Sequence, residues 1–359
     1  MNRYINSIFL ISGIALASCG NNGTKQTAQT DTTAADTVIK PLYVTEKVMC
    51  DTDDPAIWIN PADASQSLIV GTDKDEVGAL YVFDLKGKII KDKIVKGLKR
   101  PNNVDIAYGL MLNGKPTDIA VVTERMSHKL RIFSLPDMKP VDNGGIPVFE
   151  GEDEAAGFRD LMGIAMYTNA KKEIYAVVGR KTGPTTGGYL WQYLLTDDGS
   201  GHIKATLKRK FGKYSGKKEI ESIAVDNEMG YVYYSDEQFG VRKYYAEPGK
   251  GDQELNLFAK EGFKEDHEGI SIYKTGDTTG YILVSDQSAG QFKVFDRAGN
   301  NAFIKSLHVS TSNSDGSDVV SIPLNADFKH GLFVGMSDDK TFQLYRWEDL
   351  AGKDLKVNN

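Results

Sequence analysis

Cysteine is scarce in this chain of 359 residues, which contains only Cys19 and Cys50. Two cysteines, one of them in the N-terminal segment described below, cannot form a framework of disulfides, so the fold has to be stable without them. We interpret Cys50 as a buried structural thiol rather than a reactive one, because free cysteine behaves mainly as a small apolar residue.

The chain also lacks an excess of positive charge. Lys and Arg number 43 against 49 Asp and Glu, which gives a formal net charge of −6 at pH 7. Proteins that bind the phosphodiester backbone usually have a basic balance, so nucleic acid is not an expected partner. An anionic ligand would have to be bound by local groups of basic side chains.

Long hydrophobic runs are missing, and one short run, Ile8 to Leu16, lies near the N-terminus. It is too short for a membrane-spanning helix and suits a secretory signal. Its end, Leu16-Ala17-Ser18-Cys19, resembles a bacterial lipobox. We therefore predict a signal peptide at 1–19 whose removal leaves Cys19 lipidated, followed by a flexible tether at 20–41. The protein would then be attached to the bacterial cell envelope by this lipid alone, on the periplasmic or the outer face.

What the sequence does contain is a repeat of about fifty residues. Each of six units has an apolar residue, two spacers and an aromatic residue, and two further apolar runs precede this pattern. Such regular spacing indicates one structural unit repeated six times. The aromatic residues are Phe83, Phe133, Tyr193, Tyr244, Phe295 and Tyr345.

The runs in each unit are rich in β-branched and aromatic residues and are bounded by Gly, Asp and Asn, which predicts three strands with room for a fourth. A repeat of this length with about four strands is typical of a propeller blade, which buries its faces only against neighbouring blades. The sequence therefore predicts an all-β fold, a six-bladed β-propeller over 42–359. We expect one closed domain and a monomer.

Acidic residues gather just before the first strand of several units. In a propeller these strands line the central channel, so the residues that precede them meet at one end of it. Carboxylates so close together repel one another, whereas Ca²⁺ takes six to eight oxygen ligands, so we infer several Ca²⁺ ions. The segments are Asp51-Thr52-Asp53-Asp54, Asn102-Asn103, Glu219-Ile220-Glu221, Asp266-His267-Glu268 and Asp315-Gly316-Ser317-Asp318.

An alternative for any single acid is that it caps a turn by accepting backbone N–H groups. That alternative accounts for one residue more easily than for four units with carboxylates at the same end of the channel. His267 lies among these acids, and both a direct role and a supporting position are open for it.

Basic residues follow the second strand in the first three units. These strands end in Asp73-Lys74, Glu124-Arg125 and Arg180-Lys181, whereas the later three end in acids or amides. Guanidinium and ammonium groups beside Ca²⁺ suit phosphate, since they bind its oxygens while the metal polarises the phosphoryl group. Each base alone could be a solvated surface charge, but together they indicate a polyphosphorylated ligand.

Three segments resemble one known family. Asp53-Asp54-Pro55-Ala56-Ile57-Trp58, Asn102-Asn103-Val104-Asp105-Ile106 and Glu268-Gly269-Ile270-Ser271-Ile272-Tyr273 are similar, in order and in blade register, to motifs of the β-propeller phytases, which are calcium-dependent alkaline phytases of bacteria. The resemblance implies a 3-phytase type of phosphomonoesterase. Its substrate would be the calcium salt of myo-inositol hexakisphosphate, phytate, held in a funnel with a cleavage site and a neighbouring affinity site.

The resemblance also implies roles for single residues. It places Asp53, Asp54, Glu221, Glu237, Asp266 and Glu268 around the catalytic calcium ions, and Asp315, Asp318, Asp338 and the carbonyl of Val104 at structural calcium sites. It assigns substrate phosphate to Lys74, Arg125, Tyr167, Arg180 and Lys181, and the catalytic set combines Lys74 and Arg125 with Asp53, Asp54, Glu221 and Glu237. One departure is Gly179-Arg180-Lys181, where the family commonly has Gly-Lys-Glu, so that a base replaces an acid of the affinity site.

The mechanism implied is direct hydrolysis by metal-activated water, with Lys74, Arg125 and Arg180 stabilising the developing charge. Neither the Arg-His-Gly-x-Arg-x-Pro nor the Cys-x5-Arg motif of covalent phosphatases is present. Two other functions are open. Another calcium-dependent propeller hydrolase, such as a lactonase or a phosphotriesterase, would need the channel acids but not the bases, and a non-catalytic propeller would bind sugars or proteins.

Overall fold

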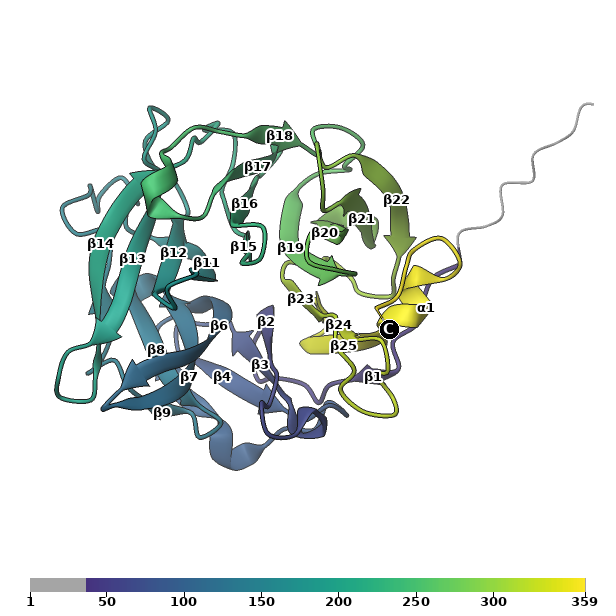
Figure 1. Cartoon of the computed structure of the whole chain (residues 1–359), viewed down its shortest axis with the longest axis horizontal. Helices are drawn as coiled ribbons and strands as arrows, with labels where there is room; N and C mark the ends of the chain where they lie inside the picture. The colour runs from purple at the N-terminus through teal and green to yellow at the C-terminus, as the bar shows by residue number, and fades with distance from the viewer. Residues whose placement is uncertain (1–36, 359) are drawn as a thin grey trace, which may run out of the picture. The chain divides into compact units, whose positions relative to one another are not determined.

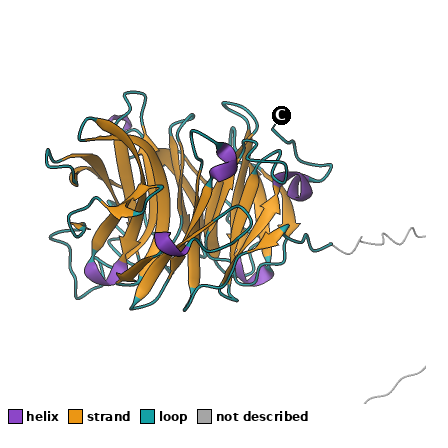
Figure 2. Cartoon of the chain, turned by 90° about the horizontal axis from the view of Figure 1, so that it is seen from below, coloured by secondary structure: helices purple, strands orange, loops and turns teal. Residues whose placement is uncertain are grey.

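The computed structural model of this chain describes residues 37–358. Its strands form six antiparallel sheets arranged in a ring, as Figure 1 shows. The prediction of a six-bladed β-propeller is therefore confirmed. Seen from the side, the strands cross the thickness of the ring and the connecting loops gather at its two faces (Figure 2).

The first three blades follow one another along the chain. In each, the strand named first is the innermost. Blade 1 contains β2 (Thr52–Trp58), β3 (Leu68–Asp73), β4 (Gly78–Phe83) and β5 (Val95–Leu98). Blade 2 contains β6 (Pro101–Leu112), β7 (Lys115–Glu124), β8 (Lys129–Leu135) and β10 (Ile146–Pro147), and β9 (Lys139–Pro140) also pairs with β8. Blade 3 contains β11 (Leu161–Thr168), β12 (Ile174–Arg180), β13 (Leu190–Asp197) and β14 (Ile203–Phe211).

The last three blades complete the ring. Blade 4 contains β15 (Ile223–Asp226), β16 (Tyr231–Asp236), β17 (Gly240–Tyr245) and β18 (Asn256–Phe258). Blade 5 contains β19 (His267–Lys274), β20 (Gly280–Asp286), β21 (Gln291–Asp296) and β22 (Phe303–His308). Blade 6 contains β23 (Ser317–Val320), β24 (Leu332–Ser337), β25 (Thr341–Arg346) and β1 (Tyr43–Val44), and the short helix α1 (Trp347–Ala351) follows it.

The six repeated aromatic residues explain how the blades hold together. All six lie on the third strand of a blade and are buried. Each belongs to a different apolar cluster, and every cluster combines side chains of two neighbouring blades. Phe83, for example, packs edge-on against Phe342 of blade 6 at a ring distance of 5.9 Å. The repeat in the sequence is therefore the repeat of the core between blades.

The ring is closed by the N-terminal strand. β1 pairs with β25, with Tyr43 opposite Leu344 and Val44 opposite Gln343. Before this strand, the Ile39 N–H donates to the His308 carbonyl at 2.8 Å. The predicted signal peptide, Cys19 and most of the predicted tether lie outside the described residues. In the part of the chain that the structure describes, no helix is long and apolar enough to cross a bilayer.

Four innermost strands carry a β-bulge near the end at which they begin. The pairing register shifts between Thr52 and Pro55 and at the corresponding points of β6, β11 and β19. A bulge turns consecutive side chains in new directions, a device often found beside active sites. The residues inside these four bulges are Asp53 and Asp54, Asn102 and Asn103, Met162 and Gly163, and Glu268 and Gly269.

Candidate active site

Seven carboxylates from four blades meet where the innermost strands begin, and we call them the funnel cluster. Their oxygens form three groups, each with its atoms within 4.8 Å of one another. Glu221 belongs to two of these groups and Glu237 to two, so the groups are continuous. The groups are Asp53, Glu221 and Asp315; Glu219, Glu221 and Glu237; and Glu237, Asp266 and Glu268.

The funnel cluster is buried, which disfavours its negative charge. Burial and the neighbouring carboxylates raise the pKa of Glu221 and Glu268 well above the usual range, that of Glu237 to about 8 and that of Asp315 to about 7. Within residues 37–358, no hydrogen-bond partner reaches Glu221 Oε1, Glu237 Oε1 or Glu268 Oε2. Buried, unpartnered oxygens beside one another are what a cation with oxygen ligands would satisfy.

The donor set of the funnel cluster favours a hard cation. All its ligand atoms are carboxylate oxygens, the type that Ca²⁺ and Mg²⁺ prefer, whereas zinc prefers Cys and His. His267 is turned away from them. Its Nε2–H donates to the Ala259 carbonyl at 2.5 Å and its ring stacks on Phe263 at 3.9 Å. The geometry therefore favours a supporting position for this histidine over a direct role.

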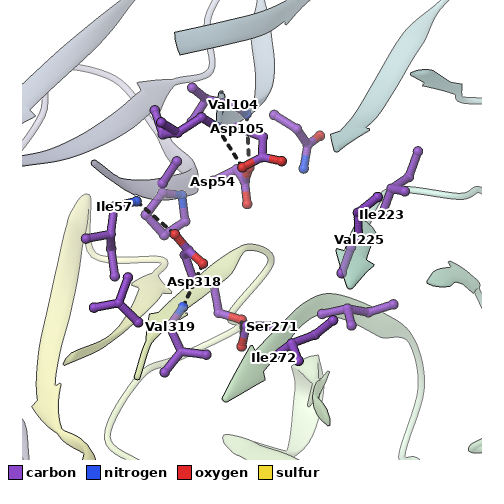
Figure 3. A pocket seen from close by; sticks show the side chains of 18 of the residues that line it. Asp54, Ile57, Val104, Asp105, Ile223, Val225, Ser271, Ile272, Asp318 and Val319 are labelled. Carbon is purple, nitrogen blue, oxygen red and sulfur yellow. Dashed lines mark hydrogen bonds between the residues drawn. The ribbon is translucent and has the colours of Figure 1, made fainter. Parts of the chain in front are cut away.

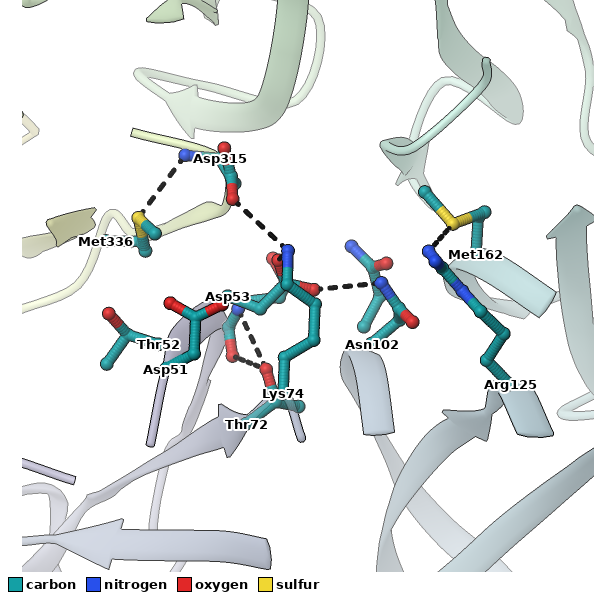
Figure 4. A network of polar contacts seen from close by, with 12 residues as sticks. Asp51, Thr52, Asp53, Thr72, Lys74, Asn102, Arg125, Met162, Asp315 and Met336 are labelled. Atoms are coloured by element: carbon teal, nitrogen blue, oxygen red, sulfur yellow. Dashed lines mark hydrogen bonds and ion pairs between the residues drawn. The ribbon is translucent and has the colours of Figure 1, made fainter. Parts of the chain in front are cut away.

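Lys74 and Asn102 hold Asp53 in place, as Figure 4 shows. The Lys74 ammonium contacts the Asp53 carboxylate and lies 3.5 Å from Asp315 Oδ2. The Asn102 amide donates to the other Asp53 oxygen at 3.1 Å. Burial by itself would lower the pKa of Lys74, but the charges of Asp53, Glu221 and Asp315 raise it on balance. Lys74 is thus a fully charged base at the funnel cluster.

Arg125 lies across from Lys74, directly after β7 (Figure 4). Its Nε donates to the Leu161 carbonyl at 3.1 Å, and the guanidinium contacts the sulfur of Met162. Burial lowers the pKa of Arg125, although its ordinary value is so high that the side chain stays charged. Among the described residues Arg125 forms no ion pair with a carboxylate, so its charge is available for an anion.

Asp54 does not join its neighbour Asp53 in the funnel cluster, in keeping with the alternation of successive side chains along a strand. One Asp54 oxygen accepts the Val104 N–H at 3.0 Å, and the side chain lines a cavity of about 220 Å³ between the innermost strands (Figure 3). Asp105 and Asp318 line the same cavity. Asp318 accepts the Ile57 N–H at 2.8 Å. We call Asp54, Asp105 and Asp318 the channel acids.

The channel acids are also forced toward their neutral forms. Burial raises the pKa of Asp54 well above the usual range, that of Asp105 to about 7 and that of Asp318 to about 6. The structure therefore divides the predicted metal ligands into two groups, with Asp54, Val104 and Asp318 in the channel and most others in the funnel cluster. Asp338 belongs to neither. It accepts from the Asn313 amide at 3.0 Å and lines a pocket of about 380 Å³ together with Asp315.

Two predicted phosphate ligands are not brought to the funnel. Tyr167 is the second-last residue of β11, at the opposite end of that strand from Leu161, and its hydroxyl donates to Glu247 at 3.3 Å. Arg180 is fully buried, pairs with Glu152 at 2.8 Å and also donates to three backbone carbonyls. Its guanidinium lies over the Phe149 ring. The polar groups of both side chains thus already interact with other residues of the protein.

Lys181 does reach the edge of the funnel cluster. Its side chain is 48% exposed and its ammonium lies 3.4 Å from Glu219 Oε2. Lys218 and Met162 of this region are not predicted from the sequence, and Glu219 is predicted only as part of the acidic segment that ends at Glu221. Glu219 had a signal, because it stands two residues before Glu221 in an acidic segment, whereas Lys218 lies in a loop without periodicity. Met162 carried no signal, since its position in a bulge is invisible in the sequence.

Comparisons with known proteins agree with this geometry. A sequence family described as Phytase matches residues 7–349. A curated 3-phytase from Bacillus subtilis (strain 168) is 28% identical over 324 residues, which covers 83% of this chain and 80% of that protein. A solved structure described as "Structure of Dos1 propeller" has a TM-score of 0.43 and 13% identity, over 82% of this chain and 67% of the other, a likeness too small to add to the argument.

Proposed function

The chain belongs to the phytase family and is an enzyme that releases phosphate from phytate, and we propose that it does so with several Ca²⁺ ions held by the funnel cluster and the channel acids. The observation that carries the calcium proposal is the set of unpartnered oxygens on Glu221, Glu237 and Glu268, buried in a site that has only oxygen ligands. Carboxylates in such a site are stable as anions only beside a cation.

The bases of the site have a distinct task in the reaction. Lys74 contacts Asp53 of the funnel cluster and Arg125 comes from the next blade, and we propose that the two bind one phosphate of the substrate through an ammonium and a guanidinium. Water attacks phosphorus in line, the bond to the inositol oxygen breaks, and that oxygen leaves with a proton. Calcium supplies Lewis-acid chemistry at the phosphoryl oxygens. Arg125 and Lys74 stabilise the charge that develops on them, since charge-assisted contacts strengthen as that charge grows.

The direct experiment measures phosphate released from phytate by the purified enzyme with Ca²⁺ and then with excess EDTA. We expect activity with calcium and its loss in the chelator. Glu221→Gln keeps the shape of the side chain but removes its charge, and should raise the calcium concentration for half-maximal rate by about tenfold or more. Glu173→Gln, which changes a carboxylate at the far end of blade 3, is the matched control. Full activity in EDTA would refute the calcium proposal.

The location of the enzyme is a second proposal. We propose that it is a lipoprotein of the bacterial cell envelope, held through lipid on Cys19 and otherwise monomeric, with the propeller outside the bilayer. The support is the sequence Leu16-Ala17-Ser18-Cys19 after a short apolar run. Cys19→Ser should release the protein from the membrane fraction while its specific activity is retained. Retention of the variant in that fraction would contradict the proposal.

A further inference from the structure

Lys218 lies inside the acidic half of the site and was assigned no role by sequence or family. It belongs to the loop between β14 and β15. Its ammonium lies 3.0 Å from Glu237 Oε2 and contacts the Asp266 carboxylate. Burial alone would lower the pKa of Lys218, but these two carboxylates raise it on balance, so the side chain is charged. One cation of the protein itself thus bridges two carboxylates of the funnel cluster.

These two carboxylates belong to a group that is suited to a metal ion. Glu237, Asp266 and Glu268 have oxygens within 4.8 Å of one another. The other Asp266 oxygen accepts from the Gln238 amide at 3.0 Å, so both oxygens of this carboxylate already have a donor, one of which is Lys218. An ammonium and a divalent cation cannot use the same oxygens, because they repel each other at such short range. Calcium binding to this group therefore requires Lys218 to leave.

The loop allows that movement for the side chain alone. Its backbone is fixed, because Ser215 donates from its N–H and its hydroxyl to Asp236, at 2.9 and 2.6 Å, and the Tyr214 hydroxyl contacts the Lys218 carbonyl. The Lys218 side chain is 37% exposed. A long, flexible, partly exposed ammonium can turn to solvent without disturbing the fold.

We propose that Lys218 is an internal counter-cation that Ca²⁺ displaces from Glu237 and Asp266, and that the displaced ammonium then binds a phosphate of the substrate. The inference rests on the proposed calcium-dependent function. It places a phosphate-binding base in the half of the site opposite Lys74 and Arg125. It also links the two ligands, since a phosphate that binds Lys218 frees the carboxylates that calcium needs.

The test compares Lys218→Met with the unchanged enzyme, using calcium alone as the first probe. By competition with a chromophoric chelator, the variant should bind calcium about tenfold more tightly, because its carboxylates no longer have to release a charged hydrogen-bond donor. Without calcium the variant should melt at a lower temperature, since two carboxylates have lost their neutralising partner. At saturating calcium the KM for phytate should rise about threefold to tenfold with little change in kcat.

Two control variants separate charge from position. Lys217→Met removes the same charge from the next residue, whose ammonium contacts the Gln238 carbonyl at 3.1 Å instead of a carboxylate, and should leave calcium affinity unchanged. Lys218→Arg should restore the behaviour of the unchanged enzyme. Equal calcium affinities for Lys218→Met and Lys217→Met would overturn the displacement, and an unchanged KM would overturn the phosphate contact. If the enzyme without any substitution binds no calcium, the proposed function itself is refuted.

Discussion

Lys181 of blade 3 and Glu219 of blade 4 form an ion pair across the gap between their blades, with Lys181 Nζ 3.4 Å from Glu219 Oε2. The resemblance to the phytase motifs implies an acid at position 181. In the structure a carboxylate at this edge of the funnel cluster comes from Glu219, which lies near Glu221 and Glu237.

We predict that Glu219 contributes to calcium binding. Glu219→Gln should raise the calcium concentration for half-maximal phosphate release, whereas Lys181→Met should lower it slightly by removing a competing cation. The coupling between the two residues in a double-mutant cycle should be small, about 0.2–1 kcal/mol, because Lys181 is half exposed. A calcium response of Glu219→Gln identical to that of the unchanged enzyme would show that Glu219 is a surface partner of Lys181 and nothing more.

Replacing Arg125 and replacing Arg180 should have different effects on activity and stability, although the family resemblance assigns both residues to phosphate binding. Arg125→Ala removes a contact that strengthens in the transition state, so kcat/KM for phytate should fall by about two to three orders of magnitude while the melting temperature changes little.

Arg180→Ala removes a buried donor from Glu152 Oε2 and from three backbone carbonyls, so it should lower the melting temperature of the protein strongly. Thermal unfolding and initial rates of both variants are the measurements. An Arg180→Ala protein of normal stability with a raised KM would return Arg180 to the substrate site.

Metal removal should destabilise the propeller. Bound calcium stabilises the native state by mass action, and its loss leaves buried oxygens of Glu221, Glu237 and Glu268 without a partner. The melting temperature should fall by at least several degrees in EDTA. It should recover with Ca²⁺ better than with Mg²⁺, which demands a tighter octahedral shell. A melting curve that chelator does not change would contradict the calcium proposal.

The metal-free protein should lose stability as pH rises. The folded-state pKa values of Asp318 and Asp105, about 6 and about 7, lie above their ordinary value of 3.8. A carboxyl with a raised folded pKa stabilises the fold while protonated, and this contribution is lost as pH rises through the folded pKa. In excess EDTA, the melting temperature should therefore fall between pH 5 and pH 8.

Asp105→Asn should make that fall smaller, because an amide stays neutral throughout this range. Asp277→Asn, at an exposed position, is the control and should not change the slope. With saturating calcium the trend should weaken or reverse, since the metal binds ionised carboxylates. The same slope for Asp105→Asn and the unchanged protein would show that Asp105 is not responsible.

The fold could be predicted from the sequence because the spacing of its apolar and aromatic residues is periodic. The six aromatics from Phe83 to Tyr345 predicted six blades because each fills the same position in a core between blades. Acids placed before innermost strands also had to converge, since the ring brings those strand ends together. Thus the positions of Glu221 and Glu268 in one cluster follow from the blade pattern, whereas Glu237, which follows the second strand of blade 4, was assigned to the metal site by the family resemblance.

Sequence reasoning failed where one residue decides the direction of a side chain. Asp53 belongs to the funnel cluster and Asp54 lines the cavity, although the sequence presents them as one pair of acids. The family resemblance implies a phosphate contact for Tyr167, but Tyr167 lies six positions beyond Leu161 in β11, toward the other end of that strand. Arg180 is the last residue of β12 and Arg125 follows directly after β7, so the two positions look alike in the sequence. In the structure, however, Arg180 forms an ion pair with Glu152 of a neighbouring loop.

Because β1 pairs with β25, the order in which the chain is synthesised determines when the ring can close. Tyr43 leaves the ribosome among the first residues of the propeller, and its partner Leu344 is about three hundred residues later. Until then β1 has no partner strand, and the two end blades of the growing row expose the apolar faces that later pack against each other. The ring can close only when almost the whole chain has been made, so a chain that stops before Thr341 stays open at both ends and is prone to aggregate.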